Sequence, residues 1–166
     1  MVGLETATAD ITAEDGAKIV AEAKSWKGTP YALVGKASSK GTGASADCSG
    51  STWHIYTDAG FPYDYQATAT FRAYVEKSGR FRELSRDEPR QDGDLLYWPG
   101  HMAIYSTFKN DDLSDAITQR VNRNGHNWTQ KNDMWTASHP GGAAYAPGAI
   151  QYWRPGEQPT VFRYVK

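Results

Sequence analysis

The chain has 166 residues, which is enough for one domain and too few for two ordinary ones. Its 18 basic and 19 acidic residues are intermixed and give a formal net charge of -1, whereas a nucleic-acid-binding protein normally presents a positive face. No run approaches the roughly 20 apolar residues of a membrane span, and a single cysteine cannot form an internal disulfide. We therefore expect one domain over residues 1–166, with no nucleic-acid and no membrane partner.

The first predicted element is a helix that follows a loose lead-in over residues 1–11. Thr12 and Asp15 form a partial capping box, and apolar residues follow at three- and four-residue spacing. The helix is expected to end near Lys27 and Gly28, because a glycine is a typical residue just after a helix end.

Two more helices are predicted after this one. Residues 35–46 are rich in Gly, Ser and Ala and form a loop of the kind that leads into a functional site. A second helix is expected over 48–59. A third is expected over 68–78, with Thr68 or Thr70 as its cap.

The rest of the chain is typical of strands. Strand-like runs are separated by Pro-Gly, Asn-Gly and Gly-Gly turn signals, and they read QDGDLLYW, HMAIYS, AITQRV, DMWTAS, AIQYW and VFRYV. Helices first and strands afterwards predict an α+β fold with an antiparallel sheet.

Cys48 is the first candidate for chemistry. It lies where the Gly/Ser/Ala-rich loop meets the second predicted helix, with Asp47 as the expected N-cap. A helix N-terminus stabilises a thiolate by at most about 2 kcal/mol, or roughly 1.5 pKa units, so a nucleophilic thiol also needs an imidazole partner. The alternative is a buried, inert cysteine. The polar residues and the glycine around Cys48 argue against this alternative.

The imidazole partner has four candidates. His54 lies on the same predicted helix, about 240° around the axis from Cys48, so the two side chains point apart. His101 begins a strand after a Pro-Gly turn, from where it can face the helix start. His126 lies in a turn, and His139 is either a third residue that orients His101 or a loop residue.

Neither a metal site nor a cofactor is expected. One Cys and four scattered His show no CxxC, HxH or HExxH spacing. The six tryptophans and ten tyrosines are assigned mainly to packing, with a carbohydrate- or peptide-binding groove as the alternative.

Three segments together resemble the NlpC-type family of bacterial cell-wall cysteine peptidases. They are DCSGSTWHIYTDAGFPY from 47, QDGDLLYWPGHMAIY from 91 and MWTASHPGG from 134. The resemblance runs from about Lys24 to Trp153. It implies a papain-like α+β domain that hydrolyses an amide bond in the peptide stems of peptidoglycan.

The resemblance also implies roles for individual residues. Cys48 would be the nucleophile and His101 the general base, with a polar residue on the next strand to orient His101. Tyr31, in GTPYALVG, matches a tyrosine that the family places beside the cysteine. We expect Tyr31, Asp47 and Ser49 to contribute to substrate or oxyanion binding.

The sequence departs from the family pattern on the third motif. Thr136 stands where the family commonly has a histidine, and His139 follows three residues later. His139 is the predicted third catalytic residue, with a backbone carbonyl or another side chain as the alternatives. The long connection over 106–132 is expected to cover one side of the groove.

The N-terminal residues are acidic and contain no apolar run typical of a signal peptide. We therefore expect synthesis in the cytoplasm and action in the periplasm or wall of a target bacterium. The delivery route would be that of a type VI antibacterial effector, with an immunity (inhibitor) protein as partner, or of a phage lysin. Two other functions stay open: a papain-like acyltransferase, and a non-catalytic wall-binding module.

Overall fold

The computed structural model describes residues 9–108, 118–123, 126–137, 144–150 and 157–166, and for 118–123 and 126–131 it describes the backbone alone. These residues form three α-helices, a short 3-10 helix, a six-stranded sheet and a separate two-stranded hairpin. All of their strand pairs are antiparallel. This confirms the predicted α+β fold with an antiparallel sheet.

Helix α1 (Ala13–Ser25) begins at the predicted capping box. The side chain of Thr12 accepts a hydrogen bond from the Asp15 N–H at 3.1 Å, and the Asp15 carboxylate accepts one from the Thr12 N–H at 2.9 Å. The helix ends at Ser25, slightly before the predicted stop, and Trp26 is its C-cap.

Residues 9–11 pair with the C-terminal strand, whereas the sequence assigned them to a loose lead-in. The Ile11 N–H donates to the Tyr164 carbonyl at 3.0 Å, and the Ile11 side chain is buried. Asp10 forms a bridge with Val165, and Arg82 binds its carboxylate. The sequence pattern misses this strand-like pairing because its partner lies at the other end of the chain.

Helices α2 (Cys48–Ala59) and α3 (Thr68–Ser78) have the predicted bounds. Gly60 ends α2 in the left-handed conformation, with φ of 101°. The N-cap of α3 is Ala67 and not Thr68 or Thr70, and no side chain caps this helix. Thr70 lies inside the helix, and its hydroxyl donates a hydrogen bond to the Ala67 carbonyl oxygen at 3.3 Å.

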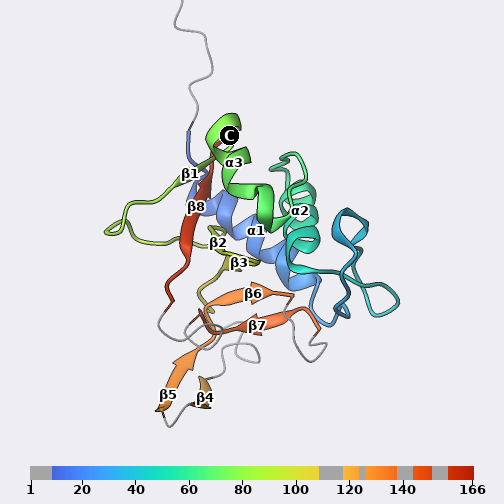
Figure 1. The fold of residues 1–166 in the computed structure, drawn as a ribbon, viewed down its shortest axis with the longest axis vertical. Helices are drawn as coiled ribbons and strands as arrows, with labels where there is room; N and C mark the ends of the chain where they lie inside the picture. Colours follow the sequence, from blue (N-terminus) through green and yellow to red (C-terminus); the bar gives the residue numbers. More distant parts are fainter. Residues whose placement is uncertain (1–8, 109–117, 124–125, 138–143, 151–156) are drawn as a thin grey trace, which may run out of the picture.

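The sheet joins strands from distant parts of the chain. In spatial order it consists of β1 (Phe81–Glu83), β8 (Thr160–Tyr164), β2 (Leu95–Trp98), β3 (His101–Tyr105), β6 (Met134–Thr136) and β7 (Ala146–Gly148). The hairpin consists of β4 (Thr118–Arg123) and β5 (His126–Lys131). The helices lie beside the sheet, and the hairpin lies at the end of the molecule away from α3 (Figure 1).

The strand predictions succeed best in the centre of the sheet. Strands β2, β3, β6 and β8 form where the sequence predicts them. β4 contains the last four residues of the run AITQRV, whose first two lie outside the described residues. In the run AIQYW, Ala149 and Ile150 follow β7 without joining a strand, and the rest lies outside the described residues. Strands β1, β5 and β7 were not predicted. β7 contains Pro147 and Gly148, which a strand tolerates at a sheet edge.

Alternate strand residues pack into two apolar clusters on the two faces of the sheet. Leu95 and Met102 belong to the large cluster that includes helix residues such as Ile55. Leu96 and Ala103, their direct neighbours in sequence, belong to the smaller cluster on the other face. Both faces of β2 and β3 are therefore covered, which fixes the register of these strands.

An ion pair ties β8 to the start of β2. The carboxylate of Asp94, which is fully buried, accepts hydrogen bonds from Arg163 Nε at 2.9 Å and Nη2 at 2.8 Å. It also accepts one from the Gln91 N–H at 2.8 Å. Because Arg163 lies on β8, this bidentate pair holds the C-terminal strand next to β2.

Candidate active site

Cys48 is the first residue of α2, and its side chain is half-buried. Asp47 is the N-cap, as the sequence predicts, and its Oδ1 accepts a hydrogen bond from the Gly50 N–H at 2.8 Å. The thiol therefore lies at the positive end of the helix dipole, where the first N–H groups of the helix point toward it.

Asp47 also holds the loop that precedes it. Its Oδ2 accepts a hydrogen bond from the Gly35 N–H at 2.6 Å, and its own N–H donates to Ser38 Oγ at 3.2 Å. Both carboxylate oxygens of Asp47 thus accept hydrogen bonds from backbone N–H groups. In this structure Asp47 positions the 3-10 helix η1 (Gly35–Ala37) against the start of α2.

Gly50 permits this close packing. A Cβ at Gly50 would lie 2.0 Å from the Gly35 carbonyl oxygen and 2.1 Å from Ser38 Oγ. No side chain fits in that space, so the loop approaches the backbone of α2 directly.

The surroundings of the Cys48 sulfur act on its pKa in opposite directions. Burial raises the pKa of the thiol, and the charge of Asp47 raises it further. Hydrogen bonds from the N–H groups of Met102, Ser49 and Cys48 itself lower this pKa. Because the N–H of Met102 belongs to the peptide group that follows His101, the thiol lies against the first peptide group of β3.

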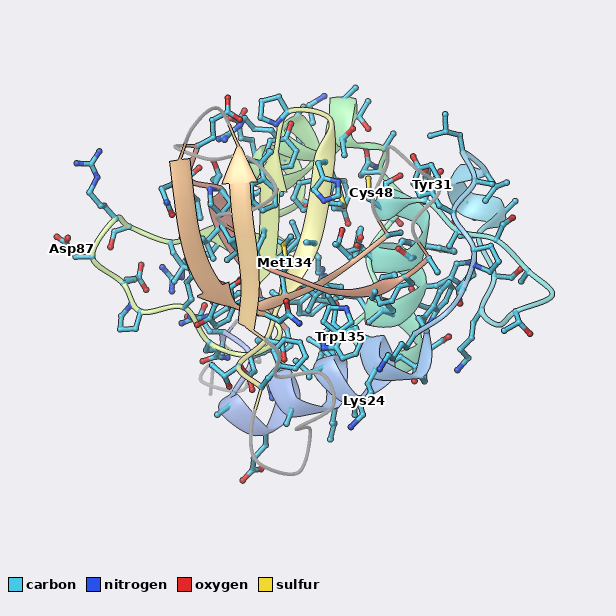
Figure 2. All side chains as sticks on the ribbon, turned by 90° about the horizontal axis from the view of Figure 1, so that it is seen from below. Lys24, Tyr31, Cys48, Asp87, Met134 and Trp135 are labelled. Carbon is cyan, nitrogen blue, oxygen red and sulfur yellow. The ribbon has the colours of Figure 1, made fainter. Side chains whose placement is uncertain are left out.

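Tyr31 lies on the same side of the molecule as Cys48 (Figure 2). Residue 31 forms a parallel bridge with Ala46, two residues before the cysteine. Burial raises the pKa of the Tyr31 phenol, and so do the charges of Cys48 and Asp47, which places the phenol near both groups. The structure thus brings Tyr31 close to the thiol.

Ser49 is buried and faces its neighbours in the loop. Its hydroxyl lies 3.2 Å from the Tyr65 hydroxyl and 3.4 Å from Asp47 Oδ1. Its backbone N–H is one of the three that are directed at the Cys48 sulfur. The structure therefore brings the main chain of Ser49 to the candidate nucleophile, while the Ser49 hydroxyl contacts Tyr65 and Asp47.

His101 is the first residue of β3 and is buried. Its Nε2 lies 3.0 Å from Thr136 Oγ1 on the neighbouring strand β6. Its ring centroid lies 5.6 Å from that of Trp98, the residue opposite it in the β2–β3 hairpin. The ring is therefore held between β2 and β6, at the end of β3 that meets the thiol.

His54 has a different environment. Its Nε2 lies 3.2 Å from the Lys36 carbonyl oxygen, and its ring packs against Trp53 and Trp26 at centroid distances of 4.7 and 5.7 Å. These contacts show that His54 packs against Lys36, Trp53 and Trp26.

His139, the predicted third catalytic residue, lies outside the described residues. Among the described residues, Thr136 places its Oγ1 3.0 Å from Nε2 of His101. The sequence marked Thr136 only as the residue that stands where the family commonly has a histidine, and the contact itself appears only in the folded sheet.

The remaining expectations concern a metal site and a membrane-spanning helix. Among the described residues, no three or more His, Cys, Asp or Glu side chains are grouped to hold a metal ion. Within the same ranges, no helix has both the length and the apolar character needed to cross a membrane.

The fold is similar to that of a crystal structure from Staphylococcus aureus subsp. aureus Mu50, described as similar to a lipoprotein of the NLP/P60 family. The match has a TM-score of 0.52 and 22% sequence identity, and covers 96% of this chain and 44% of that one. The chain thus spans less than half of that protein. No protein-family model and no curated protein matches the chain. The likeness shows the α+β fold.

Proposed function

We propose that this protein is a cysteine peptidase that hydrolyses an amide bond in the peptide stems of peptidoglycan. The observation that carries the proposal is the position of Cys48, at the start of α2 and against the first peptide group of β3, whose first residue is His101. A nucleophile at a helix N-terminus with an imidazole on the adjacent strand is the arrangement that thiol-based acyl transfer requires.

In the proposed reaction, His101 takes the thiol proton as the Cys48 sulfur bonds to the carbonyl carbon. The oxyanion that forms lies near the helix start, where the Cys48 N–H can donate to it, an interaction worth about 3 kcal/mol for a well-placed donor. The C–N bond then breaks, and His101 returns the proton to the leaving amine. Water, activated by His101, cleaves the thioester and restores the thiol.

The substrate class rests on the three motifs that resemble NlpC-type peptidases, and the structural likeness to an NLP/P60 protein is consistent with it. The proposal includes Tyr31 as a substrate- or oxyanion-binding residue, since its phenol lies near the thiol. It also includes action in the wall or periplasm of a target bacterium, with a cognate inhibitor protein in the producing cell.

Incubation of purified muropeptides with the protein, followed by mass spectrometry, tests the proposal. We expect new stem-peptide fragments whose combined mass exceeds that of the parent by one water, and their loss in Cys48→Ala. Binding without fragments would favour a wall-binding module. Products that carry an added acyl group would favour an acyltransferase.

A further inference from the structure

The β4–β5 hairpin stands apart from the rest of the described fold. Neither of its strands joins the six-stranded sheet, and within the described residues each strand packs mainly against the other. The hairpin lies at the end of the molecule away from α3 (Figure 1). Because an isolated two-stranded hairpin is marginally stable at best in water, a ligand that binds this hairpin would also stabilise it.

The hairpin also differs from the rest of the chain in charge. Its two six-residue strands contain Arg120, Arg123 and Lys131 and no Asp or Glu, whereas the remaining residues contain 15 basic and 19 acidic ones. The nearest acids along the chain are Asp115, outside the described residues, and Asp133, whose carboxylate accepts a hydrogen bond from a backbone N–H. This balance of charge favours an anionic ligand at the hairpin.

The register of the hairpin divides its residues between two faces. Residues directly opposite each other share a face, and so do alternate residues along a strand. One face carries the apolar pair Val121 and Trp128. The other, the polar face, carries only basic and hydrogen-bonding residues, namely Thr118, Arg120, Asn122, Asn127, Thr129 and Lys131.

Two basic residues are neighbours on the polar face. Arg120 is opposite Thr129, so it is diagonal to Lys131, a separation that long side chains can bridge. Like charges at neighbouring positions repel each other, and an anion bound by both residues removes this repulsion. The polar face therefore has the chemistry of a carboxylate-binding surface.

The hairpin is connected to the candidate active site through the two strands on either side of it in sequence. It lies between β3, which begins with His101, and β6, and these two strands pair with each other. The connection leaves β3 after Tyr105, about 13 Å from His101 at roughly 3.3 Å per residue. A fully extended five-residue peptide is only about 17 Å long. A polymer that carries many peptides can instead place one at the hairpin and another at the thiol.

We propose that the polar face of the hairpin is a docking surface for intact peptidoglycan, where Arg120 and Lys131 bind carboxylates of the stem peptides. The inference rests on the proposed function, from which it takes the polymer. The stem carboxylate is the ligand, because the stems are the part of the polymer that Cys48 is proposed to attack. Docking of one stem raises the effective concentration of its neighbours at Cys48.

Binding of the full chain to purified sacculi tests the proposal. The protein carries Cys48→Ala, so that the polymer stays intact, and the sacculi come from a Gram-negative bacterium, so that they contain no teichoic acid. Arg120→Gln with Lys131→Gln removes two charges from the polar face. Lys18→Gln with Arg86→Gln is the matched control, which removes the same charge from two exposed residues elsewhere.

The readout is the dissociation constant from sedimentation of the sacculi. We expect the change at Arg120 and Lys131 to weaken binding about 3- to 30-fold, the range for two exposed ion pairs, and the control to weaken it less than about 2-fold. Binding of the parent should also fall at about 1 M salt, where the Debye length is about 3 Å. Equal binding by the two double variants would overturn the proposal.

Amidation of the sacculi tests the ligand without any change in the protein. Carbodiimide and ammonia convert the stem carboxylates to neutral amides. We expect the parent to bind amidated sacculi no better than the variant at Arg120 and Lys131 binds untreated ones. Undiminished binding of the parent to amidated sacculi would overturn the proposal. So would binding that depends on these two residues with teichoic acid or DNA but not with sacculi.

The binding assay separates this inference from the proposed function. If the protein with Cys48 intact cleaves no muropeptide and binding to sacculi still depends on Arg120 and Lys131, the peptidase proposal fails and the docking surface holds. If muropeptides are cleaved and binding to sacculi is independent of these two residues, the peptidase proposal holds and the docking surface is wrong.

Discussion

Cys48 combines features that favour its thiolate with features that oppose it. Burial and Asp47 raise the pKa of the thiol, while backbone N–H groups lower it, and the net direction is upward. A thiol in this state is largely protonated near neutral pH, since an ordinary cysteine already has a pKa of about 8.5. Its reactivity at pH 7 must therefore depend on a nearby proton acceptor.

This dependence gives a prediction for His101. We expect His101→Ala to abolish hydrolysis and to slow alkylation of Cys48 by iodoacetamide at pH 7, because the thiolate then forms only as the pH approaches the raised pKa of the thiol. His54→Ala, the control, should change neither rate. Inactivation by His54→Ala in a folded protein would contradict the assignment of the base.

At the scale of single elements, the start of α2 and the loop before it depend on one carboxylate. Asp47 caps the helix through the Gly50 N–H and holds η1 through the Gly35 N–H. Both bonds are made by a buried side chain, so they are weakly screened by solvent. The position of the thiol and the position of the loop that carries Tyr31 are therefore coupled.

We expect Asp47→Ala to lower the free energy of unfolding by about 1–2 kcal/mol, the usual cost of a lost N-cap, and also to change the alkylation rate of Cys48. Thr12→Ala removes the cap of α1 and serves as the matched control. It should cost a similar free energy of unfolding in urea and leave the alkylation rate unchanged. Equal alkylation rates in the two variants would contradict the coupling.

At the scale of the whole molecule, the C-terminal strand β8 completes the sheet between β1 and β2. Its Arg163 lies against the buried Asp94, whose pKa is raised by burial and lowered by Arg163, with a net upward direction. A folded-state pKa above the unfolded value means that the contribution of Asp94 to stability is greatest below the unfolded pKa. This contribution is lost as the pH rises through the folded-state pKa.

Removal of Arg163 should make this pH dependence steeper. We expect Arg163→Met to lower the free energy of unfolding at pH 7 by about 3–5 kcal/mol, because it leaves a buried carboxylate without its ion pair. The loss should shrink as the pH falls toward 4 and Asp94 takes up a proton. Urea unfolding at several pH values measures this, and a loss that is independent of pH would contradict the role of the Asp94 charge.

The control for Arg163→Met is the double variant that also carries Asp94→Asn. In the Arg163→Met background it removes the unpaired charge while keeping the size of the side chain. We expect it to recover part of the lost stability at pH 7 and little at pH 4.

Local patterns in the sequence determined the helices, the central strands and the candidate nucleophile. The capping residues Thr12 and Asp47 act within a few positions, and helix periodicity alone separates His54 from Cys48. Such features are local in the chain, so they can be predicted before the fold is known.

Only the tertiary structure decided which distant groups meet. The pairing of residues 9–11 with β8, the short strand β1 and the contact of Thr136 with His101 all join segments far apart in sequence. No local pattern encodes them, because each forms only when the sheet has aligned its strands. The physical reason is that hydrogen-bond partners are selected by register and packing in space, whereas propensity and periodicity describe neighbours along the chain.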